Sequence, residues 1–401
     1  MKNLVLLLPW IEFLDVHLKK DTGLFPEFLA REYGLRYRIV FTDVSPRNTN
    51  VQAISDLGMI ERIPASQRNL EVPPEIDRGF VQWIRFMVPY IKFVLRTRKS
   101  VSYFMMFHLN KNTLFLVMMI KLLNRRARVW VKADASNAAI MFLQSTLSQD
   151  KLLWSKIKHH IYKSIYHKID MISVETVDVF SQMESILHDT RLSISLIPNG
   201  IEKAPRAPTS KEKIMITVAR LGTYEKNTEF LLRCFEQIDL QDWKVYLIGS
   251  IEEGFQSKIE DFYHRYPHLC ESIVFTGEIE DAGQINDCYS KSSVFLLPSR
   301  VEGFSLASIE AAMAGNYLIM SDVGSAQDLI LNDGYGHILK ESKEGSQNEE
   351  IMMQDCVSVL KNIIDGKVNI YENLEERIAY FNEHFTMENI IKQQCFQEWI
   401  G

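Results

Sequence analysis

The stretch 294-VFLLPSRVEGFSLASIEAAMAGNYLIMSDVG-324 decides the fold. Two runs within it, 294–299 and 317–322, are apolar and read as strands, and residues 306–314 between them read as a helix. Buried strands that alternate with helices are typical of a parallel sheet covered on both faces. The stretch therefore predicts a strand–helix–strand unit of an α/β domain.

The same alternation continues along the chain in both directions. Further strands are predicted in the second half at 213–219, 244–250 and 272–277, each followed by a helix. The first half shows the pattern less clearly, with strands predicted at 3–9, 36–43, 101–107, 128–133, 170–175 and 194–198, and helices at 25–33 and 112–123. The segment 200–213 is rich in proline and charge, which is typical of a linker between domains.

The composition is that of an ordinary folded protein. Of 401 residues, 46% are hydrophobic and 24% are charged, which excludes a disordered chain. The five cysteines form no CxxC pair, so the sequence supports neither a zinc site nor a disulfide framework and favours a reducing cytoplasm. The opening MKNLVLLLPW lacks the long apolar stretch and cleavage site of a signal peptide, and we interpret it as a buried strand.

Charge is distributed unevenly. Residues 1–200 hold 27 Lys and Arg against 18 Asp and Glu, whereas residues 201–401 hold 18 against 33. Between residues 79 and 168, 16 basic residues face only Asp134 and Asp150. A basic half beside an acidic half indicates two domains with different partners.

Two cations and two carboxylates follow the predicted strands of the second half. Arg220 comes directly after a strand and Lys226 lies at the start of a helix, so together they form a place for a diphosphate. Glu302 precedes a turn, and Glu310 lies within the next helix among apolar neighbours, where a buried carboxylate needs a partner. Ser305 is expected to cap that helix. Ligands of parallel-sheet domains bind at the carboxyl ends of the strands, which is where these side chains are placed.

The order of these motifs resembles a known family. PNG at 198–200, VARL and EKN within 218–227, the Glu-x7-Glu pattern at 302–310 and SDVG at 321–324 look like the family-four retaining glycosyltransferases of GT-B fold, the group 1 glycosyltransferases. The likeness covers about residues 195–335. It implies an α/β GT-B architecture of two Rossmann-like parallel-sheet domains facing across a cleft. We expect an acceptor-binding domain at 1–200, a nucleotide-sugar-binding domain at 201–375, and C-terminal helices at 376–401 that cross back to the first domain.

The resemblance also implies roles for single residues. Arg220 and Lys226 would hold the donor diphosphate, Glu302 would contact the transferred sugar, and Glu310 would bind the donor ribose. The family works without a metal or other cofactor and retains the anomeric configuration, with the leaving diphosphate acting as base on the face it leaves. The remaining donor-binding candidates are Gly303, Phe304, Ser305 and Leu306, through their backbone amides, and Gly23, which we place in the loop before a helix.

The chain departs from the family pattern on the acceptor side. The family carries a Gly-Gly pair near the donor phosphates, and here only Gly23 stands in that loop. A histidine near the acceptor is replaced by Lys132, Asp134 and Ser136. Asp134, His108 and Lys132 are the acceptor candidates; a helix cap for Asp134 and a buried structural role for His108 stay open as alternatives.

Two basic, aromatic segments, 80–99 and 151–168, read as amphipathic helices. Their composition suits peripheral contact with an anionic membrane, although two ordinary helices with their apolar faces packed inward would have the same composition. No nucleic-acid-binding module accompanies the basic charge, so we expect no nucleic acid as partner.

The predicted function is transfer of a hexose or N-acetylhexosamine from a nucleotide diphosphate sugar, with UDP expected from the resemblance, to a glycan or lipid-linked acceptor. Synthesis of a surface polysaccharide such as a capsule or lipopolysaccharide would place the enzyme in the cytoplasm, at the inner face of the cytoplasmic membrane. Two alternatives are a GT-B nucleotide-sugar epimerase and a non-catalytic GT-B partner protein.

Overall fold

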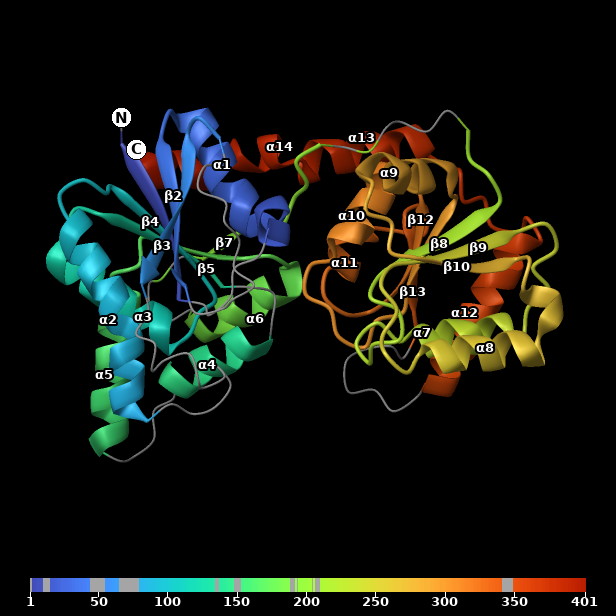
Figure 1. Ribbon diagram of the computed structural model, residues 1–401, viewed down its shortest axis with the longest axis horizontal. Coiled ribbons are helices and arrows are strands. Elements are labelled where there is room, and N and C mark those ends of the chain that lie inside the picture. The colour runs from blue at the N-terminus through green and yellow to red at the C-terminus, as the bar shows by residue number, and fades with distance from the viewer. Residues whose placement is uncertain are drawn as a thin grey trace. The chain divides into compact units, whose positions relative to one another are not determined.

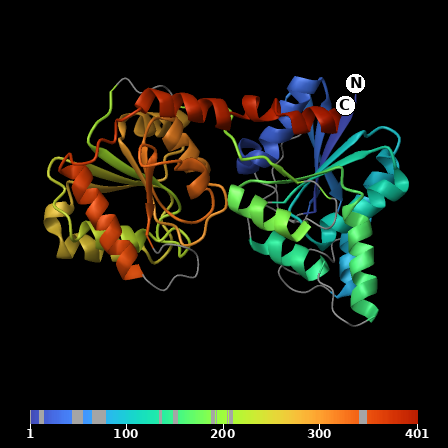
Figure 2. The ribbon, with the colours of Figure 1, turned by 180° about the vertical axis from the view of Figure 1, so that it is seen from behind.

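The computed structural model forms two compact units, which Figures 1 and 2 show from opposite sides. The first unit comprises Met1–Glu202 with Met387–Gly401, and the second comprises Lys203–Thr386. The structure describes residues 2–9, 15–43, 55–64, 79–133, 137–147, 153–187, 192, 194–203, 205, 210–340 and 349–401.

A parallel sheet of seven strands forms the centre of the first unit, in the order β3-β2-β1-β4-β5-β6-β7. The strands are β1 (Asn3–Leu8), β2 (Arg36–Asp43), β3 (Gly58–Pro64), β4 (Tyr103–Phe107), β5 (Arg128–Lys132), β6 (Met171–Val174) and β7 (Ile194–Leu196). The helices are η1 (Asp15–Lys19), α1 (Asp21–Tyr33), α2 (Phe80–Thr97), α3 (Lys111–Leu123), α4 (Asn137–Leu147), α5 (Leu153–Tyr166), α6 (Val177–Leu187), α14 (Met387–Ile391) and α15 (Gln394–Ile400).

Alternate residues of β1 supply two separate cores, one on each face of this sheet. Val5 and Leu7 pack with residues of α2, α3, α4 and α6. Leu4, Leu6 and Leu8 pack with residues of α1, α14 and α15. Because successive side chains of a strand point to opposite faces, a strand that is apolar throughout is the sequence signature of this double burial.

A parallel sheet of six strands forms the centre of the second unit, in the order β10-β9-β8-β11-β12-β13. The strands are β8 (Ile214–Val218), β9 (Lys244–Ile248), β10 (Ile273–Gly277), β11 (Val294–Leu297), β12 (Tyr317–Ser321) and β13 (Gly336–Leu339). The helices are α7 (Thr228–Phe235), α8 (Gln256–Arg265), η3 (Pro267–Leu269), α9 (Ala282–Lys291), α10 (Leu306–Met313), α11 (Ala326–Leu329), α12 (Glu349–Ile364) and α13 (Leu374–Phe385).

The expectation of two parallel-sheet α/β domains is confirmed, and each strand predicted above is present. Two edge strands, β3 and β13, and the helices α4, α6 and α12 were not predicted. The expected start of the first helix at residue 25 is wrong, because α1 begins at Asp21. Gly23 therefore lies inside the first turn of α1 and not in a loop before it. A Cβ on Gly23 would lie 2.1 Å from the carbonyl oxygen of Leu18, so glycine is required where η1 meets α1.

Candidate functional site

The candidate site lies at the carboxyl edge of the sheet in the second unit. Strands β8, β11 and β12 are neighbours there, and all three run parallel. The loops that follow them, 219–227, 298–305 and 322–325, therefore leave the sheet at one edge. Chemical side chains of parallel-sheet domains gather at this edge, and the loops carry Arg220, Lys226, Glu302 and Ser305.

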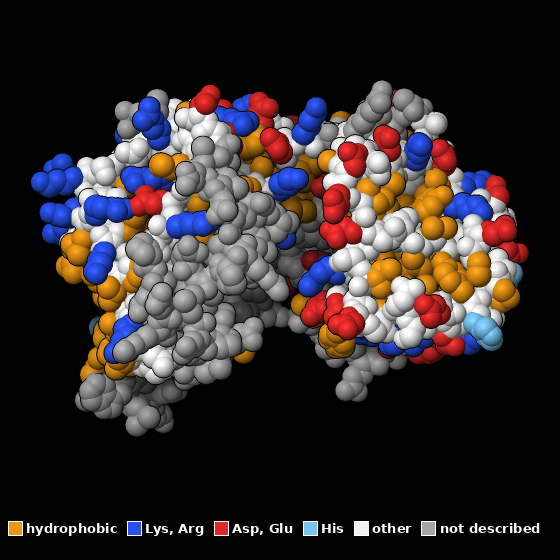
Figure 3. All heavy atoms as spheres, viewed as in Figure 1, with side chains coloured by type: hydrophobic (Ala, Val, Ile, Leu, Met, Phe, Trp, Pro, Cys, Tyr) orange, Lys and Arg blue, Asp and Glu red, His pale blue; other side chains and the backbone are white. Residues whose placement is uncertain are grey.

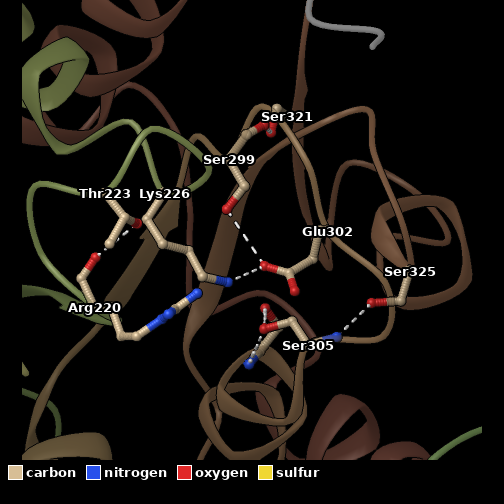
Figure 4. Close-up of polar contacts among 9 residues, drawn as sticks. Arg220, Thr223, Lys226, Ser299, Glu302, Ser305, Ser321 and Ser325 are labelled. Carbon is tan, nitrogen blue, oxygen red and sulfur yellow. Dashed lines mark hydrogen bonds and ion pairs between the residues drawn. The ribbon is translucent and has the colours of Figure 1, made fainter. Parts of the chain in front are cut away.

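Lys226 and Glu302 form the centre of the site. The Lys226 Nζ atom lies 2.5 Å from Glu302 Oε2, and the two side chains are 19% and 13% exposed. The Ser299 hydroxyl also donates to Glu302 Oε2, at 3.4 Å. Half-buried charges that pair in this way are screened less by solvent than surface charges. The loop after β8 is thereby joined to the loop after β11 (Figure 4).

Arg220 presents a second cation to the same region. Its side chain is exposed, and in Figure 4 it points toward Lys226 and Glu302. The Arg220 carbonyl oxygen accepts a hydrogen bond from the Thr223 hydroxyl at 3.2 Å, which closes the turn between Arg220 and Lys226. The structure thus brings together the two cations and the carboxylate for which the sequence predicted catalytic roles.

Arg300 fixes the loop that carries Lys226. Its backbone N–H donates to the carbonyl oxygen of Glu225 at 2.8 Å, and its guanidinium donates to the carbonyl oxygen of Tyr224 at 3.1 Å. The guanidinium also lies over the Tyr224 ring, 4.8 Å from its centroid, and reaches Glu349 at 3.2 Å. Arg300 was not predicted as a site residue, although its position soon after a strand that ends in the site was a usable signal.

Gly324 supports Glu302 from the third loop. It has a left-handed backbone with φ of +57°, and a Cβ there would lie 2.1 Å from the Gly303 carbonyl oxygen and 2.8 Å from that of Glu302. Only glycine fits both the conformation and this close approach. The SDVG motif therefore has a local physical reason: its glycine lets the loop after β12 pack on the backbone of the catalytic candidate.

The start of α10 is capped as the sequence predicted. The Ser305 hydroxyl accepts a hydrogen bond from the Ser308 N–H at 3.2 Å, which confirms the expected cap. The Ser305 N–H itself donates to the Ser325 hydroxyl at 3.4 Å, so one of the four predicted donor-binding amides already has a partner. Phe304 is buried, and its ring centroid lies 6.1 Å from that of Phe385. This packing holds the backbone of the segment from Gly303 to Leu306 in place.

Glu310 lies in α10, half-buried, in the surroundings that its apolar neighbours predicted. Burial raises the pKa of the Glu310 carboxyl, while interaction with the Tyr289 phenol opposes that rise. The Tyr289 hydroxyl is fully buried and makes no hydrogen bond of ordinary geometry among the described residues. Burial, and then the nearby Glu310, raises the pKa of the Tyr289 phenol. Glu310 is therefore a carboxylate held in a poorly solvated place, where hydroxyl donors from a ligand would stabilise its charge.

Asn227, next to Lys226, is a further residue that the sequence analysis did not single out. It is buried with a left-handed backbone, φ of +53°, and its side-chain carbonyl oxygen has no hydrogen-bond partner within the described ranges. A non-glycine residue in this conformation is uncommon, with asparagine among the enriched types, and such residues collect at functional sites.

The remaining candidates belong to the first unit. Lys132 is fully buried, and its ammonium group is bound by Glu175 and by Asn199, the latter at 2.8 Å. An acceptor would have to displace these partners. His108 follows β4 with a left-handed backbone, φ of +63°, and Asp134 lies outside the described residues.

No group of three or more His, Cys, Asp or Glu side chains within the described ranges is arranged to hold a metal ion. None of the described helices combines the length and the apolar character needed to cross a bilayer.

Residues 212–362 match the family model described as glycosyl transferases group 1. Among curated relatives, the lipopolysaccharide core biosynthesis mannosyltransferase LpcC of Rhizobium leguminosarum is 24% identical over 54% of this chain and 65% of its own length. The amylovoran biosynthesis glycosyltransferase AmsD of Erwinia amylovora is 30% identical over 34% of this chain and 37% of its own length. The chain thus covers less than two thirds of the length of either relative.

Solved structures match over the whole chain. The lipopolysaccharide outer core galactosyltransferase WaaB superposes with a TM-score of 0.67 at 15% identity, covering 100% of this chain and 99% of that one. The pneumococcal O-GlcNAc transferase GtfA in complex with UDP and GlcNAc gives a TM-score of 0.65 at 15% identity, with the same coverage. At this identity the likeness establishes the fold alone, which is the GT-B fold with its two parallel-sheet α/β domains.

Proposed function

From the premise that the chain has the GT-B fold and that residues 212–362 form a group 1 glycosyltransferase domain, we propose that the protein is a retaining glycosyltransferase that uses a nucleotide diphosphate sugar. The observation that carries the proposal is the convergence of Arg220, Lys226 and Glu302 at the carboxyl edge of one sheet. Two cations beside a carboxylate suit a ligand with a diphosphate next to a hydroxyl-rich sugar.

In the proposed reaction, the bond between the anomeric carbon and the diphosphate oxygen breaks while the acceptor oxygen bonds to that carbon on the same face. The acceptor proton passes to the departing diphosphate. Arg220 and Lys226 stabilise the charge that grows on the diphosphate, so they act more strongly on the transition state than on the bound donor. No metal takes part in this scheme, and no second catalytic carboxylate is needed.

Glu302 and Glu310 bind the donor in this proposal. When the donor binds, the Lys226 ammonium group contacts the diphosphate as well as Glu302. Glu302 then accepts hydrogen bonds from sugar hydroxyls. Glu310 accepts from the ribose hydroxyls, and the amides of Gly303, Phe304 and Leu306 contact sugar and phosphate. Gly23 of the first unit is the remaining donor-binding candidate.

UDP is the proposed nucleotide, with a hexose or N-acetylhexosamine as the sugar. Structural neighbours were solved with UDP and GlcNAc and with UDP-glucose, which supports this choice for the present chain. The proposed acceptor is a glycan or a lipid-linked sugar in surface polysaccharide synthesis, with Asp134 and His108 as its contacts. The setting we propose is the cytoplasmic face of the inner membrane, with helices α2 and α5 toward anionic lipid.

The first experiment measures the thermal shift of the protein with UDP, GDP, ADP and CMP. A ligand at a hundred times its Kd stabilises the folded state by about 2.7 kcal/mol, which is readily detected. We expect UDP to stabilise the wild type and to lose this effect in Glu310→Ala. Glu260→Ala, an exposed glutamate on α8 of the same unit, is the matched control and should keep the full shift. Stabilisation by none of the four nucleotides would overturn the proposal and favour a non-catalytic partner.

The second experiment follows the chemistry. Incubation with the UDP-sugar and an acceptor panel should yield a product whose new linkage has the donor's anomeric configuration, read by proton NMR, and a chelator should leave the rate unchanged. A changed donor sugar without any acceptor would instead identify an epimerase. An inverted linkage would contradict the same-face scheme.

A further inference from the structure

An apolar pocket of about 410 Å³ opens between helices α2, α3 and α5 of the first unit. Its lining includes Trp83, Phe115, Met118 and Ile165, with the charged group in the lining supplied by Lys111. The pocket belongs to none of the loops that carry the candidate site. Contiguous exposed apolar surface on a water-soluble domain marks a place where something binds.

The walls of the pocket are held in place by the protein itself. The Trp83 indole N–H donates to the Asn112 side chain at 2.6 Å, and its ring meets that of Phe115 edge to face at 4.9 Å. The Phe80 ring lies 6.0 Å from the Trp83 ring. A pocket with walls fixed by hydrogen bonding and ring contacts loses little conformational entropy when a ligand enters.

Large apolar side chains stand exposed on α2 and α5, two of the helices that line the pocket. Phe80 is 75% exposed and Val81 62% exposed in the first turn of α2, and Ile161 is 54% exposed on α5. Ile157, one helical turn before Ile161, is 41% exposed. Single exposed apolar residues are ordinary, but four on two adjoining helices around one apolar pocket form a surface that water solvates poorly.

The charged side chains of the two helices α2 and α5 are all basic. Neither α2 nor α5 contains an aspartate or glutamate, and the exposed cations on them include Arg85, Lys92, Lys156 and Lys158. Hydrophobic and basic side chains lie next to each other over α2 and α5, at the lower left of Figure 3. Helices with apolar and aromatic groups at the surface and lysine or arginine beside them bind the interface of anionic membranes.

We propose that this surface docks on a leaflet of anionic phospholipid and that the pocket between α2, α3 and α5 receives one acyl chain of that lipid. The cations of α2 and α5 attract the phosphate headgroups, and their long aliphatic stems follow the apolar surface. Phe80, Val81 and Ile161 enter the interface, and the acyl chain contacts Trp83. The docking deepens the membrane setting proposed above, and the acyl-chain site goes beyond it; both rest on residues outside the nucleotide site.

The test uses the full chain and vesicles of phosphatidylcholine, with or without phosphatidylglycerol in place of part of that lipid. Sedimentation should carry the wild type down with the mixed vesicles and leave it in solution with phosphatidylcholine alone. Phe80→Gln with Ile161→Gln should lower the bound fraction at least tenfold without changing charge. Leu122→Gln, which replaces a 71% exposed leucine at the far end of α3, is the matched control and should bind like the wild type.

Entry of an acyl chain is read from tryptophan fluorescence with lipids brominated along the chain. Quenching by these lipids should be strong for the wild type and clearly weaker for Trp83→Phe, which keeps an aromatic ring in the wall. Equal quenching of the two proteins would overturn the acyl-chain site. Failure to sediment with mixed vesicles, or self-association of the wild type that the Phe80 and Ile161 substitutions abolish, would overturn membrane docking.

The same samples separate this inference from the proposed function. All three variants should keep the thermal shift caused by UDP, because their substitutions lie outside the nucleotide site. A protein that binds vesicles but no nucleotide would contradict the function alone, and one that binds UDP but no vesicles would contradict the docking surface alone.

Discussion

Glu302 is fixed by three neighbours before any donor arrives. Lys226 neutralises its charge, Ser299 donates a hydrogen bond, and the bare Cα of Gly324 lets the next loop pack directly on its backbone. A carboxylate held in this way needs little reorganisation when sugar hydroxyls replace part of its interaction with Lys226. Preorganised polar groups of this kind are the largest single source of transition-state stabilisation in many enzymes.

Unlike Glu302, Glu310 has no cation paired with its carboxylate among the described residues, and burial raises the pKa of its carboxyl. A carboxyl whose pKa is higher in the folded chain than in the unfolded chain stabilises the fold fully below the unfolded pKa, and this contribution is lost as the pH rises through the folded pKa. At neutral pH the ionised Glu310 therefore lowers the free energy of unfolding. This loss of stability comes from holding a poorly solvated carboxylate in the place where, in the proposed function, it binds the ribose.

We predict that Glu310→Gln raises the melting temperature of the ligand-free protein at neutral pH, because the amide stays neutral. The difference from wild type should shrink as the pH falls below about 4.3, the ordinary pKa of glutamate, where the wild-type carboxyl is protonated too. The same variant should lose most of its stabilisation by UDP. Calorimetry across this pH range checks both statements, and a variant that is less stable than wild type at every pH would contradict them.

At the residue scale, the sequence predicted which charged residues lie in the candidate site, but not which residues pair with a buried charge. Arg220, Lys226 and Glu302 were found from their places after strands, and the structure brings them to one edge. Lys132 shows what the sequence could not reveal: its burial depends on Glu175 and Asn199, which are 43 and 67 residues away along the chain. A pairing between distant strands leaves no local pattern that a single sequence displays.

Helix α10 is fixed by hydrogen bonds at both ends, and these also fix the position of Glu310, which lies in this helix. Ser305 caps its first turn. At its other end, Lys211 Nζ donates to the carbonyl oxygen of Ala314 at 2.5 Å and to that of Ser292, just after α9, at 2.7 Å. A cation at a helix C-terminus satisfies open carbonyls and interacts favourably with the helix dipole.

We predict that Lys211→Met lowers the free energy of unfolding by about 2 kcal/mol, because it leaves buried carbonyls without a donor. Lys213→Met is the control, since Lys213 is 55% exposed, pairs with Asp242 among the described residues, and should change stability far less than Lys211→Met. Urea unfolding measures the free energy of unfolding of both variants. An equal decrease for the two variants would rule out the capping role of Lys211.

The effect should also depend on pH. Burial, and then the nearby Arg377, lowers the pKa of Lys211 to about 7 in the folded chain, whereas an unfolded lysine has a pKa of about 10.4. Between these values the unfolded chain binds a proton that the folded chain has released, so the wild type gains stability as the pH rises. Lys211→Met lacks this gain, and its deficit should widen from pH 7 to pH 10. A deficit that stays constant over this range would show that the folded chain keeps the lysine charged, and would contradict the lowered pKa of Lys211.

At the element scale, the sequence predicted the central strands and missed one edge strand of each sheet, β3 and β13. Strand β3 (GMIERIP) pairs with β2 alone and carries Glu61 and Arg62, so it lacks the continuous apolar run of a strand buried on both faces. Strand β13 (GHIL) is four residues long and also pairs on one side only. Edge strands are short and partly polar because one side meets no neighbour, and the apolar signature then fades.

At the scale of the whole molecule, the chain leaves its first unit at Glu202 and returns to it at Met387. The tail therefore contributes to two separate cores. Phe385, in α13, is buried with its ring 5.8 Å from Phe381 and 6.1 Å from Phe304, all in the second unit. Trp399, fourteen residues later, meets Trp130 at 5.7 Å and Tyr103 at 5.3 Å in the first unit.

We predict that substitutions in these two tail residues destabilise different units. Replacing a buried Trp or Phe by Ala costs about 3–5 kcal/mol through lost burial and the cavity left behind. Trp399→Ala should therefore speed amide hydrogen exchange in peptides from residues 1–202, whereas Phe385→Ala should speed it in peptides from residues 203–386. Each variant serves as the control for the other, with mass spectrometry of the exchanged peptides as the measurement. Because the ring contacts described for each side chain lie within its own unit, loss of protection in the same peptides for both variants would contradict this prediction and mean that the two units unfold together.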